Sequence, residues 1–174
     1  MNPDLKEIFE NVNRWLQFGE AKNGVLVVFC TSISVALIQS YKDIMGCLPI
    51  EIYSCGLVIF CILAAIVGTL SFLPQVRLPW TYDRELPDQH DNIYFYGHIK
   101  KYQPDALLSL LDLRRGTSTS FTAADRDLAE QIIVNSRITW NKYINFKFGI
   151  WLAMSGLITP ILAAVLYLNL NRSK

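Results

Sequence analysis

The chain has 174 residues, of which 52% are hydrophobic, and its formal net charge at pH 7 is +1. The small charge argues against a nucleic-acid-binding protein, and a mean hydropathy of +0.26 is high for a soluble domain. Because the hydrophobic residues are concentrated in three uncharged runs, the composition indicates a membrane protein.

Residues 1–23 form a polar arm that we expect to be a cytoplasmic amphipathic helix. Asn2 and Pro3 fit an N-cap followed by a first-turn proline. The arm could lie on the membrane surface or pack against the middle of the chain, and its few basic residues favour packing. Its apolar residues recur at steps of three and four, at Leu5, Ile8, Phe9, Val12, Trp15 and Leu16.

Three runs without Asp, Glu, Lys or Arg, at 24–41, 52–73 and 148–170, are predicted to be transmembrane helices. As helices they measure about 27 Å for the first and about 33 to 35 Å for the others, against a hydrocarbon core of about 30 Å. The alternative is a buried core helix of a soluble protein, which is usually shorter and carries charges where it meets water.

The distribution of Lys and Arg predicts the orientation, since positive loops remain cytoplasmic. The arm holds three and the 74–147 segment ten, whereas the 42–51 loop holds one and the 171–174 tail two. We therefore expect the arm and the 74–147 segment inside, and the loop and the tail outside. The predicted fold class is mainly α, with three transmembrane helices and a small helical cytoplasmic domain formed by the arm and the segment between spans two and three.

The cytoplasmic segment contains four local signals. Residues 92–99, NIYFYGHI, predict a short β-strand, with a helical turn as the alternative. Pro104 can open a helix whose leucines share one face, and this leucine-rich helix could form either a domain core or a docking surface for a protein. Residues 114–120, RRGTSTS, predict a polar loop that could hold a phosphate or simply be solvated.

The last signal is a capping box formed by Thr122 and Asp125. No Gly or Pro follows it before Gly149, so one helix is expected to run from the cytoplasmic domain into the third span.

Catalytic and metal-binding motifs are missing from the sequence. There is no nucleophile elbow, phosphate loop, dinucleotide-binding glycine motif or zinc-protease motif, and the only histidines are His90 and His98. We therefore expect no enzyme activity, no metal and no cofactor. The 74–147 segment has ten basic and nine acidic residues, a balance of +1 that argues against a nucleic-acid partner. The uncharged spans argue against a permanently open ion pathway.

Three stretches carry a resemblance to a known family: WLQFGEAKNGVLV before the first span, NIYFYGHI, and AEQIIVNSRITWNKY before the third. The sequence resembles the small transmembrane effectors of bacterial Pycsar antiphage systems over nearly its whole length. The residues that match the family pattern are Glu20, Lys22 and Gly24, then Phe95, Tyr96, Gly97 and His98, and finally Asn135, Ser136, Lys142 and Tyr143.

The resemblance implies an antiphage effector in the bacterial inner membrane, multi-pass, with its N-terminus and central domain cytoplasmic and its C-terminus periplasmic. Such an effector responds to a cyclic nucleotide made by a partner cyclase, a cyclic pyrimidine monophosphate being favoured, and impairs the membrane so that growth stops or the cell dies. The partners implied are the lipid bilayer, the cyclic nucleotide and further copies of the chain in a homo-oligomer. A non-signalling membrane scaffold that docks a cytoplasmic protein is the alternative.

Candidate ligand contacts follow from side-chain chemistry, and each also has a purely structural interpretation. Aromatic rings can stack on a base, cations can bind a phosphate, and two further polar residues belong to the matching stretches. The candidates are Tyr94 and Tyr96, then Lys22, Arg114 and Lys142, and finally His98 and Asn135.

Overall fold

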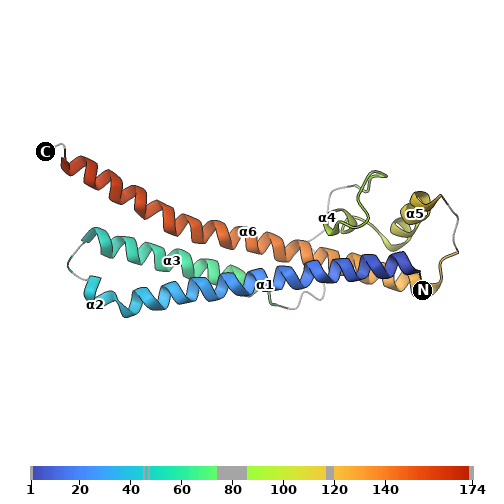
Figure 1. Ribbon diagram of the computed structural model, residues 1–174, viewed down its shortest axis with the longest axis horizontal. Helices are drawn as coiled ribbons and strands as arrows, with labels where there is room; N and C mark the ends of the chain where they lie inside the picture. Colours follow the sequence, from blue (N-terminus) through green and yellow to red (C-terminus); the bar gives the residue numbers. More distant parts are fainter. Residues whose placement is uncertain (1, 45, 47, 74–85, 117–119, 173–174) are drawn as a thin grey trace. The chain divides into compact units, whose positions relative to one another are not determined.

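The computed structural model describes residues 2–44, 46, 48–73, 86–116 and 120–172, and this part of the chain is helical without any strand (Figure 1). The mainly α class is therefore confirmed for these residues. Parts of the predicted 42–51 loop, 74–147 segment and 171–174 tail lie outside them. The helices are α1 Pro3–Gln39, α2 Tyr41–Ile44, α3 Leu48–Leu70, α4 Tyr96–Ile99, α5 Pro104–Arg115 and α6 Ala123–Arg172.

The chain divides into two compact units. The first comprises Met1–Glu20 and Pro74–Tyr143, and the second comprises Ala21–Leu73 and Ile144–Lys174. The two long helices in Figure 1, α1 and α6, each contribute residues to both units. A single uninterrupted α6 confirms the helix expected after the capping box.

The β-strand predicted at 92–99 is wrong, and the alternative, a helical turn, is confirmed. The Asn92 side-chain oxygen accepts the Tyr94 N–H at 2.8 Å, and the Asn92 N–H is donated to His98 Nδ1 at 2.9 Å. These bonds occupy backbone groups that a strand would pair with a neighbour. The short helix α4 follows at Tyr96, so local polar bonds overcome the β-propensity of the aromatic residues.

The polar loop predicted at 114–120 begins later than expected. Pro104 occupies the first turn of α5, as predicted, but the helix continues through Arg114 and Arg115. It ends at Gly116, whose φ of 66° places it in the left-handed region that glycine adopts at low cost. Residues 117–119 of the predicted loop lie outside the described part of the chain.

The arm packs into the core of the first unit, which confirms the preference for packing over a membrane-surface helix. Leu5, Ile8 and Val12 on α1 are fully buried. They recur at steps of three and four, so they form one face of the helix. They pack with buried residues of the middle segment and α6, including Ile99, Leu107, Leu108, Leu110, Leu111, Ile132 and Ile133.

One hydrogen-bond network caps the N-termini of α1 and α6. The predicted capping box is present, with Asp125 accepting the Thr122 N–H at 3.0 Å and the Thr122 hydroxyl at 2.8 Å. Asp125 also accepts the Asn2 N–H at 2.8 Å, and that bond is the main reason that the pKa of Asp125 falls to about 2. Asn2 in turn caps α1 and accepts a bond from Arg115, which also pairs with Asp4. The start of each helix is thus tied to the other.

The second unit is a bundle of α1, α3 and α6 that meets at small residues. A Cβ added at Gly68 would lie 2.8 Å from Val27 Cγ2, and one at Gly149 would lie 2.5 Å from Leu26 Cδ2. A larger residue at either position would force these side chains to move, and such close approach at glycine is common between membrane helices. The buried core of this unit comprises Leu26, Cys30, Leu57, Cys61, Ala64 and Ala153.

In the described part of the chain, two helices, α1 and α3, are long and apolar enough to cross a membrane. Only 22% and 28% of the residues in their apolar windows are buried. A core helix of a soluble protein would be mostly buried, whereas large apolar side chains such as Val25, Val28 and Ile59 are 69%, 65% and 58% exposed here. Helices that face lipid present an apolar surface of this kind.

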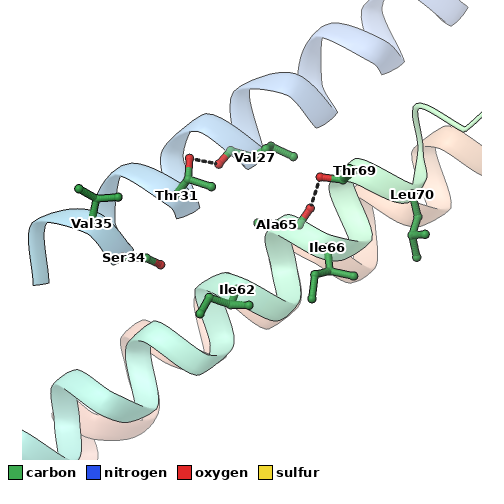
Figure 2. Close-up of a pocket in the computed structure, with 9 residues that line it drawn as sticks. All are labelled: Val27, Thr31, Ser34, Val35, Ile62, Ala65, Ile66, Thr69 and Leu70. Atoms are coloured by element: carbon green, nitrogen blue, oxygen red, sulfur yellow. Dashed lines mark hydrogen bonds between the residues drawn. The ribbon is translucent and has the colours of Figure 1, made fainter. Parts of the chain in front are cut away.

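An apolar groove of about 380 Å³ lies between α1 and α3 on the surface of the second unit (Figure 2). The hydroxyls in its walls are bonded within their own helices, since Thr31 donates to the Val27 carbonyl and Thr69 to the Ala65 carbonyl. The groove therefore presents almost only hydrocarbon. Its walls are formed by Val27, Thr31, Ser34 and Val35 of α1 and by Ile62, Ala65, Ile66, Thr69 and Leu70 of α3.

Candidate functional site

A polar seam joins α1 and α6 within the first unit. The two helices run parallel, because successive contacts keep a nearly constant separation of 122 or 123 residues. Polar pairs at a helix interface fix the register, since sliding by one residue would separate each pair. The three contacts are Asn2 with Asp125, Asn13 with Asn135 at 2.8 Å, and Glu20 with Lys142 at 3.2 Å.

The last contact of the seam is a partly buried ion pair. The Lys142 side chain is only 8% exposed, whereas that of Glu20 is 47% exposed. A buried ammonium group requires an anionic partner, because removing it from water is otherwise costly. The Glu20 side of the pair is open to solvent, so another anion could reach Lys142 from that side.

Aromatic rings surround Tyr96 beside this pair. Tyr96 is 7% exposed and stacks on Tyr143, with 5.4 Å between ring centroids and 22° between planes. Trp15 of α1 lies 5.8 Å from Tyr96, and Trp140 lies 6.5 Å away. The pKa of Tyr143 is raised to about 12, mainly because the ring is buried and to a lesser extent because Tyr96 is close. Trp15 keeps 39% of its surface exposed, so the cluster reaches solvent at α1.

A second buried cation belongs to the same cluster. The Lys100 ammonium nitrogen lies 3.9 Å from the ring centroid of Trp140, which is a cation–π distance. Lys100 is 4% exposed. Aromatic surface and desolvated positive charge therefore lie together, and this is the chemistry that recognises a nucleobase carrying an anionic phosphate.

A separate polar cluster centres on Asp91. Its carboxylate accepts hydrogen bonds from the Asp88 N–H, the Lys101 ammonium and the Tyr102 hydroxyl, all between 2.8 and 2.9 Å. Burial alone would raise the pKa of Asp91, but these bonds hold it below its usual value. His98 Nδ1 lies 3.5 Å from the same carboxylate. These bonds fix the chain that leads into α4 and so place Tyr96.

A family model described as the Pycsar effector protein domain, PycTM, matches residues 4–169. The chain belongs to the Pycsar effector family. It is 24% identical over 156 residues to the Pycsar effector protein PtPycTM of Propioniciclava tarda, an alignment that covers 89% of this chain and 74% of that protein. No solved structure matches the chain.

In this Pycsar effector the predicted ligand contacts lie in two clusters, with the exception of Lys22. Tyr96, Asn135 and Lys142 belong to the seam and its aromatic cluster. Three others lie around Asp91. His98 approaches the Asp91 carboxylate, and Arg114 donates hydrogen bonds to the Gln89 and Asp91 carbonyls. Tyr94 is three residues from Asp91 in the sequence and is 40% exposed. Lys22 belongs to the second unit, with its ammonium 5.5 Å from the Phe146 ring.

Sequence reasoning missed several residues of the Pycsar effector's aromatic cluster. The sequence pattern places Trp15 among the apolar residues of the arm, and it predicts no ligand contact for Trp140 or Lys100. The sequence does carry a signal for the seam, because Asn13 and Glu20 are seven residues apart, as are Asn135 and Lys142. Two equal spacings of this kind indicate one shared helix seam. Asp91 and Lys100 become recognisable only through their burial.

Within the described ranges, no three His, Cys, Asp or Glu side chains are grouped as metal ligands would be.

Proposed function

We propose that this Pycsar effector senses a cyclic nucleotide made by a partner cyclase and responds by impairing the bacterial inner membrane. The favoured ligand is a cyclic pyrimidine monophosphate, and the outcome is growth arrest or cell death. The observation that carries the proposal is that α1 and α6 each combine a segment of the aromatic unit with a segment of the apolar unit. A ligand that changes the α1–α6 seam therefore acts on helices that also belong to the membrane bundle.

The proposal includes a third span at 148–170, within α6. Large apolar side chains on this segment are exposed, among them Phe148, Trp151 and Ile161 at 63%, 59% and 55%. This exposed apolar surface supports a third span. With three spans, the Lys and Arg distribution supports a cytoplasmic N-terminus and 74–147 segment and a periplasmic 42–51 loop and tail. The proposal also includes assembly of several copies, for which the same surface is available.

The ligand site in this proposal is the open side of the Glu20–Lys142 pair. A cyclic phosphate carries a single negative charge and would take the place of Glu20 at the Lys142 ammonium. The base would stack on the aromatic cluster at Trp15. Displacing Glu20 releases one of the contacts that hold α1 to α6 in register. The ligand shifts the equilibrium only by its greater affinity for the released state.

The scaffold alternative is less well supported by the leucines that suggested it. Leu107, Leu108, Leu110 and Leu111 are buried in the core of the first unit, and Leu113 is 59% exposed. A docking surface requires exposed apolar area, so four of these side chains are unsuited to it.

Binding measurements on the full chain in nanodiscs test the sensing step. Calorimetry with a panel of cyclic mononucleotides and cyclic dinucleotides should detect one ligand that binds. Lys142→Met should weaken that binding at least tenfold, while Lys147→Met, which changes an exposed lysine five residues further along α6, should leave it unchanged. No binding of any panel member would exclude the sensor and favour the scaffold. Equal effects of the two variants would reject the Lys142 site.

A further inference from the structure

The apolar groove between α1 and α3 must be filled in a membrane. Its hydroxyls are already bonded to carbonyls of their own helices, as Figure 2 shows for Thr31 and Thr69, and Ser34 donates to the Cys30 carbonyl at 2.9 Å. Such a groove offers a ligand no polar anchor. Its occupant is therefore hydrocarbon, either a lipid chain or the side chains of another helix.

A matching ridge runs along α6 in the same unit. Its exposed large apolar side chains recur at steps of three and four, so they form one continuous face of the helix. This face is turned away from the bundle core, in which Gly149, Ala153 and Gly156 of α6 are buried. The ridge consists of Phe148, Trp151, Met154, Ile158, Ile161 and Val165, all between 41% and 63% exposed.

Contacts within the unit show which part of the ridge lies at the depth of the groove. Gly149 packs against Leu26 of α1 and the Ala64 carbonyl of α3, so these three positions lie within about one helical turn of the same depth. On α1, which runs parallel to α6 here, the groove begins at the next residue, Val27.

On α3, which runs antiparallel to α6, Gly156 packs against Phe60, so Trp151 lies between the depths of Ala64 and Phe60, where the groove residue Ile62 is found. Both walls of the groove face each other at this level. Trp151 is 59% exposed, and it is the largest side chain of the ridge.

We propose that the groove binds a second copy of this chain, with Trp151 of one copy inserted between α1 and α3 of the next. Copies inserted in one orientation and related by an axis along the membrane normal keep each residue at the same depth, so Trp151 of a neighbour meets the groove at its own level. This inference rests on the proposed function, in which α6 crosses the membrane.

Packing favours the helix over a lipid chain as the occupant, and the ridge is large enough for such a contact. Apolar burial does not drive helix association in lipid, so the contact depends on close packing, and a rigid indole ring fills a groove with less loss of conformational freedom than a flexible acyl chain. The six ridge side chains expose on the order of 600 Å², against about 800 Å² per partner in a standard interface. The ridge thus supplies most of the area that a stable contact needs.

The contact is head-to-tail, because the groove and the ridge are different surfaces of one chain. Contacts of this type extend into rings or open arcs and do not stop at a dimer. Assembly beyond the dimer is therefore a direct consequence.

Disulfide crosslinking in native membranes tests this contact on the full chain, with its four cysteines replaced by alanine. Thr31→Cys combined with Met154→Cys, a ridge residue that is 41% exposed and leaves Trp151 in place, should give a ladder of dimers, trimers and larger species on oxidation. The control pair, Phe29→Cys with Met154→Cys, uses a residue at similar depth on α1 that is 48% exposed but does not line the groove. It should give at least tenfold less product.

Three results would overturn the proposal: no ladder from the groove pair, which would leave lipid as the occupant; an equal ladder from the control pair; or dimers from Met154→Cys alone, which would indicate a symmetric contact.

A second measurement uses the unmodified groove. Native mass spectrometry in nanodiscs should show about tenfold weaker assembly for Trp151→Ala than for the wild type, and an intermediate effect for Trp151→Phe. Ile52→Ala, which changes an α3 residue that is 65% exposed and outside the groove, should assemble normally. Unchanged assembly of Trp151→Ala would contradict the contact.

Neither measurement requires a nucleotide. A chain that binds nucleotide but shows no ladder would therefore lose this inference and keep the proposed function.

Discussion

Replacing Glu20 with Gln should destabilise the protein by leaving the Lys142 ammonium without its carboxylate. The two groups are 3.2 Å apart, and at an effective dielectric constant of about 20 their attraction is about 5 kcal/mol. Breaking a fully buried pair costs about 3 to 5 kcal/mol. Because Glu20 is 47% exposed, water offsets part of that cost, and we expect a loss of about 2 kcal/mol, or a fall in melting temperature of roughly 4 to 8 °C.

Thermal unfolding in detergent, followed by the fluorescence of Trp15 and Trp140, measures this loss. Glu10→Gln is the matched control, since its ion pair with Lys6 is 4.0 Å long and 62% exposed on both sides, and it should change the melting temperature by less than about 2 °C. Combining Glu20→Gln with Lys142→Met removes both charges and should restore most of the stability. Equal melting of the two single variants would refute the reasoning.

Three further perturbations test other parts of the fold. The pKa of Asp125 is lowered from 3.8 to about 2, so its contribution to stability is present above about pH 4 and is lost as the pH falls towards 2; Asp125→Asn should flatten the melting temperature over that window. Gly97→Ala would place a Cβ 2.5 Å from the Phe95 ring, and denaturant titration should show a loss of about 1 to 3 kcal/mol; no loss would mean that the ring simply moves aside. Gly156→Val should separate α3 from α6, because even a Cβ would lie 2.6 Å from Phe60, and protease sensitivity of the second unit should rise; wild-type resistance would contradict the close packing.

Periodicity and turn chemistry predicted most of the helices. The arm, the helix beginning at Pro104 and the helix after Thr122 each carry local signals, namely a repeating apolar face, a first-turn proline and a capping box. These signals are short-range, so they can be read without knowing the fold. The structure agrees with all three.

The error at 92–99 has a local cause that propensity does not capture. Aromatic residues favour strands, yet Asn92 and His98 bond the backbone of this stretch to itself. A preference of about 1 kcal/mol between residue types is easily exceeded by two such bonds.

The seam and the aromatic cluster depend on contacts between distant parts of the chain. Tyr96, Trp15 and Tyr143 meet only after α1 and α6 are aligned, and no local pattern predicts that alignment. Lys142 was selected for its charge, but its burial and its pairing with Glu20 follow from the tertiary fold alone.

Release of dye from liposomes tests the central claim most directly. The purified protein is reconstituted in dye-loaded vesicles, and the nucleotide panel is added with empty vesicles as the control. The account predicts that the vesicles stay sealed until one cyclic nucleotide is added, and the favoured nucleotide is a cyclic pyrimidine monophosphate. It also predicts that Lys142→Met shifts dye release to a higher nucleotide concentration. Vesicles that stay sealed with every nucleotide, or that leak equally without any, would contradict a ligand-gated membrane effector.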